Sequence, residues 1–455
     1  MFSKSKSIDM CSGPLFVNIF KFTIPFVLTA LLQNMYHAAD VIVVGRYAGQ
    51  EALAGVGTTG SISALILNFF VGISLGVSVT LGRALGEKNK NKIHEIIHTA
   101  IMLSLMCGLF VSVFGVIFAH PLLEMIRVPD NVMPQAKIYM QIVFIGNIPN
   151  LLYTFSAAIL RAKGDTRRPF YIVSLSGIIN VILNLIFVLQ FRMKAAGVAL
   201  ATVISQTVSA VIITVILVKE EDYTRLYISR LKVYRDRLFD ILKVGIPTGM
   251  QSVFFSVSNV MVQTAINGFG SAMIAGNAAA DNIGHFYYVA VNSFSHGAVA
   301  FVSQNLGARN YKRINKIVAY CLLDVLIVWI IEIIITLSCA ENLIRIYAPN
   351  DIEAIKMGII RVTIVCSTYG LCGLMDVMSA TLRGLGYALG DMIISVVCIC
   401  GLRILWIFTV FKMIGTPEAL FMSYPVTWVI TFIMYSLLYL YAKNKIIKNE
   451  VYVKL

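Results

Sequence analysis

Asp40 is an acidic residue in an otherwise apolar stretch, and it is the first candidate for chemistry in this chain. Aliphatic residues follow it directly, in the segment Asp40-Val-Ile-Val-Val-Gly45. Desolvation disfavours the charged form of a carboxyl group, so an aspartate held away from water readily takes up a proton or pairs with a hard cation. Asp40 therefore indicates a site for ion coupling. The alternative is a structural aspartate that is hydrogen-bonded to neighbouring helices.

Asn180 and Asn184 form a second polar feature in apolar surroundings. They are four residues apart, so a helix places both amides on one face. Two amides on an apolar helix require a polar partner, and Asp40 is a candidate because it belongs to the same half of the chain. We predict that the three residues form one ion-coupling site, which could hold a proton or Na⁺. The alternative is hydrogen bonding between helices, worth about 0.6–2 kcal/mol per bond.

Further polar and aromatic residues in apolar stretches are predicted to line a substrate cavity. His37 lies three residues before Asp40, on the same helical face. It could relay protons, or it could be a structural hydrogen-bond partner. The full set of predicted cavity residues is Gln33, Asn34, Tyr36, His37, Asn150, Thr154, Thr202, Gln251 and His285.

The composition requires a membrane around these residues. Of the 455 residues, 58% are hydrophobic and 13% are charged, against roughly 25% charged in soluble proteins. Uncharged runs recur near the ~20 residues that a helix needs to cross the hydrocarbon layer. Helices satisfy their own backbone amides in lipid, so we predict an all-α integral membrane protein. The predicted spans are 15–45, 55–82, 93–119, 134–160, 169–191, 195–218, 241–268, 275–305, 314–340, 355–382, 388–413 and 417–442.

The second half of the chain repeats the first at an offset of about 221 residues. Four pairs of markers share this register: Ile24-Pro25 with Ile246-Pro247, Leu85-Gly86 with Leu306-Gly307, Val128-Pro129 with Ala348-Pro349, and Leu160-Arg161 with Leu382-Arg383. Transporters are commonly built from such repeats, with the substrate site between them. The repeat predicts two pseudo-symmetric six-helix bundles, 1–218 and 241–455, joined by a charged cytoplasmic linker over 219–240.

Basic residues predict the orientation of the chain. The net charge is +14, and most of the 37 Lys and Arg lie at both termini and in the even-numbered loops. Because basic loops stay on the cytoplasmic side, we predict a multi-pass protein of the inner (cytoplasmic) membrane with both termini inside. The charge is therefore topological, and nucleic acid is not an expected partner. The eight cysteines show no metal-ligand or disulfide spacing.

The second half carries its own charged residues in the predicted spans. No acid corresponds to Asp40, whose register partners are Met261 and Val262. The second-half acids could form structural pairs or take part in transport, and they are Asp281, Asp324, Glu332 and Asp376. Arg361 and Arg403 are basic residues within spans of this half, and Arg403, in the middle of its span, requires a carboxylate or carbonyl partner. Pro25 and Pro247 occupy matching places in the first span of each half, where proline removes a backbone donor and favours a kink.

These motifs together resemble the multidrug and toxic compound extrusion (MATE) family, of the bacterial DinF-like type. The motifs that carry the resemblance are Asp40-Val-Ile-Val-Val-Gly45-Arg46, Ile159-Leu-Arg161-Ala-Lys-Gly164-Asp165-Thr166, Gln304-Asn-Leu-Gly307-Ala308 and Leu382-Arg383-Gly384-Leu-Gly386. The resemblance implies two six-helix lobes that alternate between outward-facing and inward-facing states. It also places a coupling acid at Asp40 and an amide pair at Asn180 and Asn184. This chain departs from the family at Tyr153-Thr154, where Tyr-Asn is common, and at Gly284-His285, where a Glu is common.

We therefore expect a secondary-active antiporter that acts as a monomer and without a cofactor. It would export organic cations or other amphiphilic compounds in exchange for H⁺ or Na⁺ by alternating access. A flippase for a lipid-linked precursor is the alternative transport function, although basic residues are scarce within the spans. An enzyme is not expected, because the sequence has no HExxH motif, no phosphate-binding loop and no nucleophile–base set.

Overall fold

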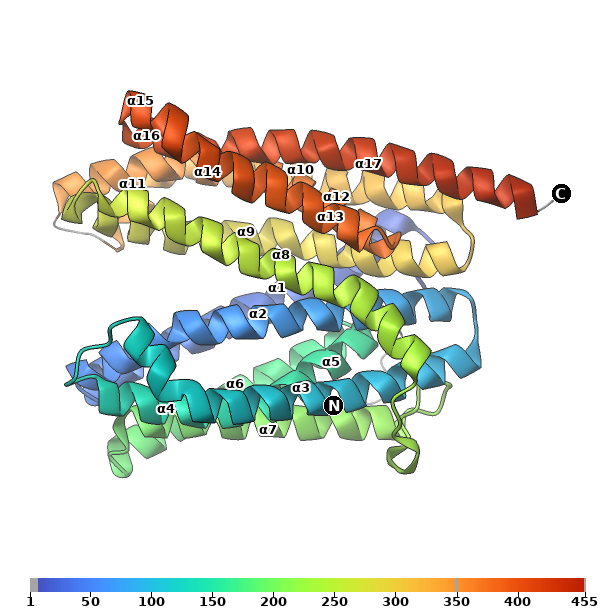
Figure 1. The fold of residues 1–455 in the computed structure, drawn as a ribbon, viewed down its shortest axis with the longest axis horizontal. Helices are drawn as coiled ribbons and strands as arrows, with labels where there is room; N and C mark the ends of the chain where they lie inside the picture. Colours follow the sequence, from blue (N-terminus) through green and yellow to red (C-terminus); the bar gives the residue numbers. More distant parts are fainter. Residues whose placement is uncertain (1–6, 348–350, 454–455) are drawn as a thin grey trace. The chain divides into compact units, whose positions relative to one another are not determined.

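The computed structural model describes residues 7–347 and 351–453, and the regular elements of these residues are all helices (Figure 1). The first half contains α1 (Leu15–Tyr47), α2 (Gln50–Gly86), α3 (Lys90–Met125), α4 (Met133–Ile145), α5 (Asn147–Lys163), α6 (Arg167–Leu185), a π-helical η1 (Ile186–Gln190) and α7 (Lys194–Lys219). The connector contains a single 3₁₀ turn, η2 (Ile228–Arg230). The repeat marker Ala348-Pro349 lies outside the described residues.

The second half follows the same order. It contains α8 (Arg235–Asn267), α9 (Ser271–Gly307), α10 (Tyr311–Arg345), α11 (Ile352–Ile364), η3 (Cys366–Thr368), α12 (Tyr369–Gly384), α13 (Ala388–Ser395), η4 (Val396–Gly401), α14 (Leu402–Trp406), η5 (Ile407–Phe411), α15 (Lys412–Ile414), α16 (Pro417–Phe421) and α17 (Ser423–Val453). The repeat extends to irregular features. The fourth segment of each half is interrupted at Gly146 and at η3, and a π-helical turn recurs as η1 and η5.

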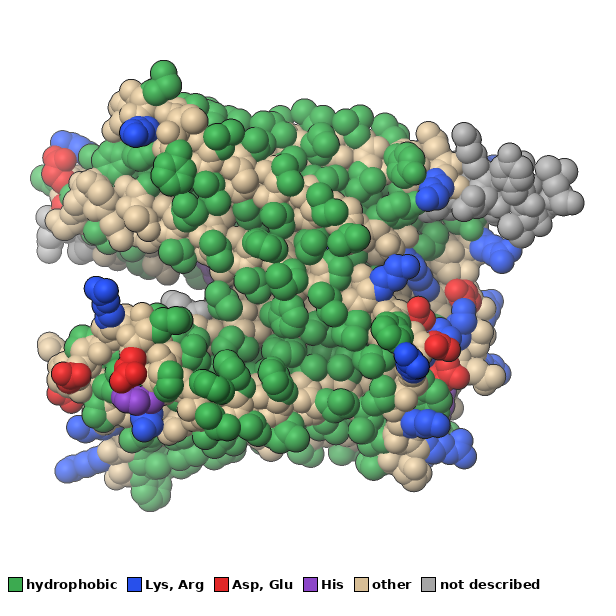
Figure 2. Space-filling model, viewed as in Figure 1, with side chains coloured by type: hydrophobic (Ala, Val, Ile, Leu, Met, Phe, Trp, Pro, Cys, Tyr) green, Lys and Arg blue, Asp and Glu red, His purple; other side chains and the backbone are tan. Residues whose placement is uncertain are grey.

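Ten helical segments of the described chain are long and apolar enough to cross a membrane, if the bent pair α4–α5 (44°) is counted as one. The two remaining long helices are α8 and α9, with 33 and 37 residues. They are less apolar because they carry many amides, hydroxyls and charged residues. Together these segments give the predicted all-α, twelve-helix architecture, which is confirmed. Figure 2 shows apolar side chains over the sides of the helices, with Lys, Arg and acidic residues gathered near the helix ends.

The chain packs as two units, each with its own core, and the boundaries fall inside helices. Unit 1 holds Ile24–Gly249 with the described residues before Asp9, and unit 2 holds Asp9–Thr23 and Met250–Leu455. The division thus lies in α1 beside Pro25 and in α8 beside Pro247, rather than in the connector. Both helices continue through their prolines.

Glycines allow α2 and the first part of α8 to approach closely within unit 1. A Cβ atom on Gly72 would lie 2.4 Å from the backbone nitrogen of Gly249, and one on Gly76 would lie 2.9 Å from that of Gly245. Small residues permit this kind of close helix packing in membranes. The first part of α8 is therefore an integral element of unit 1.

The first part of α1 packs in the same way within unit 2. The rings of Phe22 and Phe301 meet edge to face, with centroids 5.7 Å apart. Just before α1, the amide nitrogen of Asn305 donates to the backbone oxygen of Met10 at 2.9 Å, and Arg313 donates to the backbone oxygen of Ser12 at 2.7 Å. The segment 10–12 is thus fixed to α9 and α10.

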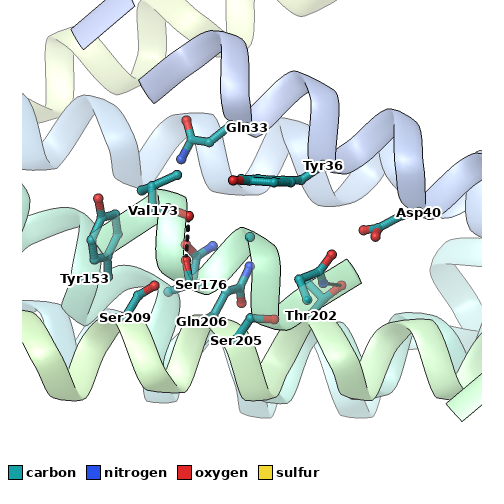
Figure 3. Close-up of a pocket in the computed structure, with 13 residues that line it drawn as sticks. Gln33, Tyr36, Asp40, Tyr153, Val173, Ser176, Thr202, Ser205, Gln206 and Ser209 are labelled. Atoms are coloured by element: carbon teal, nitrogen blue, oxygen red, sulfur yellow. Dashed lines mark hydrogen bonds between the residues drawn. The ribbon is translucent and has the colours of Figure 1, made fainter. Parts of the chain in front are cut away.

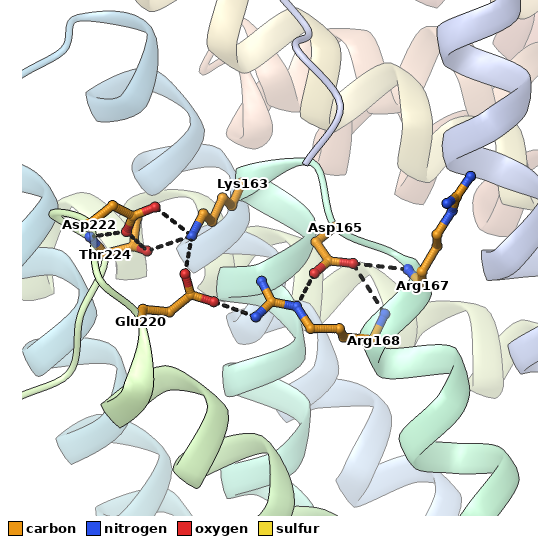
Figure 4. A network of polar contacts seen from close by, with 7 residues as sticks. All are labelled: Lys163, Asp165, Arg167, Arg168, Glu220, Asp222 and Thr224. Carbon is orange, nitrogen blue, oxygen red and sulfur yellow. Dashed lines mark hydrogen bonds and ion pairs between the residues drawn. The ribbon is translucent and has the colours of Figure 1, made fainter. Parts of the chain in front are cut away.

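An ion-pair network joins three helix ends of unit 1 to the connector (Figure 4). Arg168 contacts both Asp165 and Glu220, while Lys163 contacts Glu220 and, at 2.6 Å, Asp222. Burial alone would raise the pKa of Asp222, but its bonds with Lys163 and Thr224 outweigh this and hold the pKa below its ordinary value. The connector then runs along α3, where the backbone nitrogen of Tyr227 donates to His98 Nε2 at 3.2 Å.

Candidate functional site

A cavity of about 250 Å³ lies within unit 1 between α1, α5, α6 and α7. Polar side chains supply most of its wall, and from α1 three of them project toward α6 and α7 (Figure 3). The lining residues are Gln33, Tyr36, Asp40, Asn150, Tyr153, Val173, Ser176, Gly177, Asn180, Thr202, Ser205, Gln206 and Ser209. The cavity is thus lined by amides, hydroxyls and the single carboxylate of Asp40.

A chain of hydrogen bonds runs from Asp40 into this wall. Asn184 donates through Nδ2 to Asp40 Oδ1 and, at 3.2 Å, to Asn180 Oδ1. Asn180 donates in turn to Thr202 Oγ1 at 3.3 Å, and Thr202 donates to the backbone oxygen of Val198 at 3.0 Å. This chain of bonds therefore connects α1 to α6 at Asp40 and α6 to α7 at Thr202.

Asn184 is the central residue of this chain of bonds. Its side chain is only 1% exposed, and its Oδ1 atom has no hydrogen-bond partner among the described residues. It is the penultimate residue of α6, two residues before the π-helical turn η1 begins, and π-helical turns are frequent at functional sites. Na⁺ coordination requires oxygen atoms, so a cation at Asp40 would need the amide to turn and present Oδ1. In the observed orientation Nδ2 donates to the Asp40 carboxylate and stabilises its charged form.

Tyr36 reaches the cavity because a glycine faces it. A Cβ atom on Gly177 would lie 1.8 Å from the Tyr36 ring, so no larger residue fits there without moving the ring. The Tyr36 hydroxyl donates to the backbone oxygen of Ser174 at 3.2 Å. This contact fixes the ring against α6, one turn of α1 before Asp40.

The structure brings most of the residues predicted for the first half together. Asp40, Asn180, Gln33, Tyr36, Asn150 and Thr202 line the cavity, and Asn184 lies behind it. Thr154 is not in the lining, and its hydroxyl donates to the backbone oxygen of Asn150 at 2.8 Å. Asn34 is also outside the lining. The side chain of His37 lies outside the described part of the structure.

Two predicted cavity residues belong to unit 2. Gln251 is buried in α8 and lines neither cavity described here. His285, on α9, lines a separate cavity of about 220 Å³ within unit 2, together with Asp281 and Asp376. Neither residue is thus grouped with Asp40 in the cavity of unit 1.

Sequence reasoning missed a row of polar residues on α7. Ser205, Gln206 and Ser209 line the unit 1 cavity beside Thr202. Their spacing of three to four residues places them on one helical face. This periodicity was visible in the sequence and could have identified them.

The charged residues of unit 2 fall into two groups. Asp281 pairs with Arg361, which also contacts Asn277, and Asp376 accepts a bond from Asn292 Nδ2 at 2.7 Å. In contrast, Asp324 and Glu332 on α10 are buried, and their carboxyl oxygens have no hydrogen-bond partner in the described chain. Among those described residues, no group of three or more His, Cys, Asp or Glu is arranged to hold a metal ion.

The sequence model of the MatE family matches residues 25–186 and 247–409, one segment in each half of the chain. The chain belongs to the MATE family. Probable multidrug resistance protein YoeA of Bacillus subtilis (strain 168) is 24% identical over 390 residues, which cover 84% of each chain. Probable multidrug resistance protein YpnP of the same strain is 23% identical over 309 residues, covering 68% of this chain and 69% of that protein.

Another relative has a name that gives a different function. The FAD transporter of Shewanella oneidensis is 22% identical over 425 residues, covering 92% of this chain and 93% of that protein.

Among solved structures, a multidrug resistance MATE family transporter of the MOP superfamily in an outward-facing conformation superposes on this chain with a TM-score of 0.88. It is 20% identical and covers 97% of this chain and 100% of that chain. The predicted family is confirmed, and this MATE protein is a multi-pass membrane transporter.

Proposed function

We propose that this protein exports small amphiphilic organic compounds, organic cations among them, in exchange for H⁺ or Na⁺ by alternating access. The observation that carries the proposal is the hydrogen-bonded carboxylate of Asp40 in a polar cavity of unit 1. An ionisable residue within a membrane span is costly, and it is a functional candidate when it faces a cavity. The names of the multidrug resistance relatives support the substrate class.

Asp40 would couple the ion to the substrate through its bond with Asn184. A hydrogen bond to a carboxylate is about twice as strong as one between neutral groups. Protonation or cation binding at Asp40 would weaken the contact from Asn184 and change the packing between α1 and α6. Coupling requires that the ion and the substrate each bind the two facing states with different affinity.

The α1 helix is well placed to respond to such a change. Its first residues, through Thr23, pack in unit 2, and the part that carries Asp40 packs in unit 1. Pro25 lies beside this division and leaves one helical carbonyl without its usual donor. A small change in bend at this point would therefore move Asp40 relative to the start of its own helix.

The lobe boundaries, the orientation and the oligomeric state form part of the proposal. We assign residues 1–218 and 241–455 to the two halves of the transport cycle, with 219–240 as a cytoplasmic connector and both termini inside an inner membrane. The two halves are present in one chain, which supports a monomer as the active form. The cavity of unit 1 has no Lys or Arg in its described lining, which argues against the phosphates of a lipid-linked precursor as cargo.

The test is transport in vesicles that contain the purified protein, with a pH gradient and a Na⁺ gradient imposed separately. We expect one gradient to drive uphill movement of a fluorescent organic cation. Asp40→Asn is expected to reduce this movement at least 100-fold while the protein still inserts and purifies normally. Asp351→Asn is the matched control, because it retains a side chain that can cap α11 and Asp351 is in the lining of neither cavity described above. Uphill export by Asp40→Asn at the wild-type rate would refute the assignment.

A further inference from the structure

The cavity of unit 2 lies at the positions that the repeat makes equivalent to the cavity of unit 1. Six lining positions correspond at a constant offset of 222 residues: Gln33 with Phe255, Asn150 with Cys372, Tyr153 with Met375, Gly177 with Ile399, Thr202 with Tyr424, and Gln206 with Trp428. Such agreement identifies the two cavities as the same feature of the two repeats. Each pair, however, exchanges a polar or small residue, or a tyrosine, for a more apolar or more aromatic one.

Aromatic rings form one connected wall of the unit 2 cavity. The centroids of Tyr369 and Trp428 are 5.5 Å apart, those of Tyr424 and Trp428 are 5.7 Å apart, and those of Tyr288 and Tyr369 are 6.3 Å apart. These separations are typical of favourable aromatic contacts. The wall therefore offers flat faces and edges against which a planar ring can stack.

Arg403 is a buried charged residue of this cavity that has few polar contacts and no carboxylate partner among the described residues. Its residue is 4% exposed, its guanidinium lies 4.2 Å from the centroid of the Tyr424 ring, and it takes part in no ion pair with a described residue. Its Nη1 donates to Asn259 Oδ1 over a long 3.4 Å, and its Nε has no hydrogen-bond partner among the described residues. A buried cation without an anion is strongly unfavourable, so this group is suited to receive one.

The acidic residues of the cavity already have donors. Asp376 accepts from Asn292 Nδ2 at 2.7 Å, and Asp281 is paired with Arg361. An incoming cation would therefore compete with donors that these carboxylates already hold. An incoming anion would instead meet the unpaired guanidinium of Arg403.

The backbone before Arg403 has an irregularity that unit 1 lacks. The π-helical η4 spans Val396–Gly401 and ends two residues before Arg403, whereas α6 is α-helical over the equivalent residues 174–179. A π-helical turn holds one more residue per hydrogen-bonded ring and rotates the side chains that follow it. The turn thus helps to set the direction in which Arg403 points.

We propose that the unit 2 cavity binds planar aromatic compounds that carry an anionic group such as a carboxylate. The anionic group pairs with Arg403, whose guanidinium is suited to carboxylates in bidentate geometry, and the ring stacks against Tyr424, Trp428 and Tyr369. A volume of about 220 Å³ suits a compound of one or two fused rings. The inference extends the proposed export function by naming one class of cargo, but the binding itself does not depend on that function.

The test is calorimetric titration of the purified full-length protein with three two-ring probes: 2-naphthoate, its neutral amide, and the corresponding naphthylmethylammonium. We expect naphthoate to bind at least ten times more tightly than either analogue. Arg403→Gln is expected to weaken naphthoate binding at least tenfold and to leave the affinity for the amide within twofold. Tighter binding of the ammonium compound, or unchanged naphthoate affinity in Arg403→Gln, would overturn the proposal.

Two further variants keep this test decisive. Arg403→Lys retains the charge, so it is expected to fold if loss of a buried charge harms Arg403→Gln, and to bind naphthoate with an intermediate affinity. Trp428→Phe removes part of the aromatic wall and is expected to weaken all three probes to a similar degree. If Arg403→Lys and Trp428→Phe both bind naphthoate as the wild type does, the cavity is not its site.

The binding test is independent of the transport test. Asp40→Asn is expected to abolish coupled export and to keep the preference for naphthoate over its amide and ammonium analogues, because Asp40 lies in the other cavity. Loss of that preference in Asp40→Asn would contradict the assignment of this ligand to unit 2. Normal uphill export by Asp40→Asn, in contrast, would remove the proposed function and leave the binding site standing.

Discussion

The cavities of the two units occupy equivalent positions in the repeat but satisfy their charges in opposite ways. In unit 1 the carboxylate of Asp40 is met by the amide nitrogen of Asn184. In unit 2 the guanidinium of Arg403 has an aromatic face and a long bond to Asn259, but no carboxylate. The backbone repeat thus fixes where a cavity forms, and the side chains decide which ion or ligand it suits.

The packing around the two cavities differs in a compensating way. In unit 1 a large residue, Tyr36, lies against Gly177. At the equivalent positions of unit 2 the small residue is Ser258 and the large one is Ile399. The large side chain is thus a hydroxyl-bearing ring on α1 in unit 1 and an aliphatic side chain on η4 in unit 2. Unit 2 therefore has no equivalent of the contact that the Tyr36 ring of α1 makes with α6.

After Asp40 itself, Asn184 is the residue whose replacement should have the largest effect on the unit 1 site, because it is the donor to the Asp40 carboxylate. Asn184→Leu replaces the amide by an apolar group of similar size, and it leaves Asp40 and Asn180 without their shared partner. Losing a donor to a charged, partly buried group costs about 1.5–3 kcal/mol. We expect coupled export to fall at least tenfold, measured as initial uptake into vesicles under the driving gradient. Asn184→Asp is the informative companion, because it restores a polar group and adds a second acid; unchanged export by Asn184→Leu would show that the amide is dispensable.

Gly177→Ala tests whether the position of Tyr36 matters. The added methyl group overlaps the Tyr36 ring, so the ring must leave its place against α6 and lose its bond to Ser174. Overpacking of this kind costs roughly 1–3 kcal/mol, and we expect both a lower melting temperature in detergent and a several-fold loss of export. Gly60→Ala is the control, because an added Cβ there meets no atom within 4 Å. Equal melting temperatures for the two variants would contradict the described packing.

The buried acids of α10, in unit 2, are expected to differ from Asp40 because their replacement should not impair export. Glu332 and Asp324 have no hydrogen-bond partner among the described residues, and neither lines the cavity of unit 2. If unit 1 alone senses the coupling ion, Glu332→Gln and Asp324→Asn should export at near wild-type rates. Their melting temperatures should be equal to or above that of the wild type, because an amide cannot become charged in this apolar place. Loss of coupling in either variant would move part of the ion pathway into unit 2.

The smallest expected effect concerns the ion-pair network on the connector. The pKa of Asp222 is lowered from 3.8, so its contribution to stability is present above that value and is lost as the pH falls through the lowered pKa. Asp222→Asn should therefore melt slightly below the wild type at pH 6, and the two should converge as the pH falls below about 4. Asp130→Asn, in an exposed turn, is the control. A difference that persists undiminished at pH 3 would show that charge is not its cause.

Much of the fold follows from the sequence, for physical reasons that individual segments illustrate. Apolar runs such as the one in α10 have to be helical in lipid, because every backbone amide there needs an internal partner. The spacing of Asn180 and Asn184 places both amides on one face, which makes contact with an acid of the same half a reasonable expectation. The structure shows that contact for Asn184, while Asn180 bonds instead to Asn184 and Thr202.

Other features depend on tertiary contacts that sequence patterns do not contain. The polar row on α7 was visible, but only the packing of α5 and α6 shows that it faces a cavity. Arg403 was recognisable as a residue that needs a partner, yet its actual surroundings depend on Tyr424 and on Asn259, which is 144 residues away. The division of α1 and α8 between the units likewise arises from packing: a proline lies beside each division, but the sequence does not show which unit each helix end joins.

The exchange of helix ends between the units has a consequence for cutting the chain. A break placed between residues 221 and 234 would leave α1 through α17 intact, yet neither fragment could complete its own core. The first fragment would lack the start of α8, leaving Gly72 and Gly76 of α2 uncovered, and the second would lack Phe22 against Phe301. Each polypeptide would therefore need the other to complete its core, because the start of α1 belongs to unit 2 and the start of α8 belongs to unit 1. The two should fold fully only when they are made together.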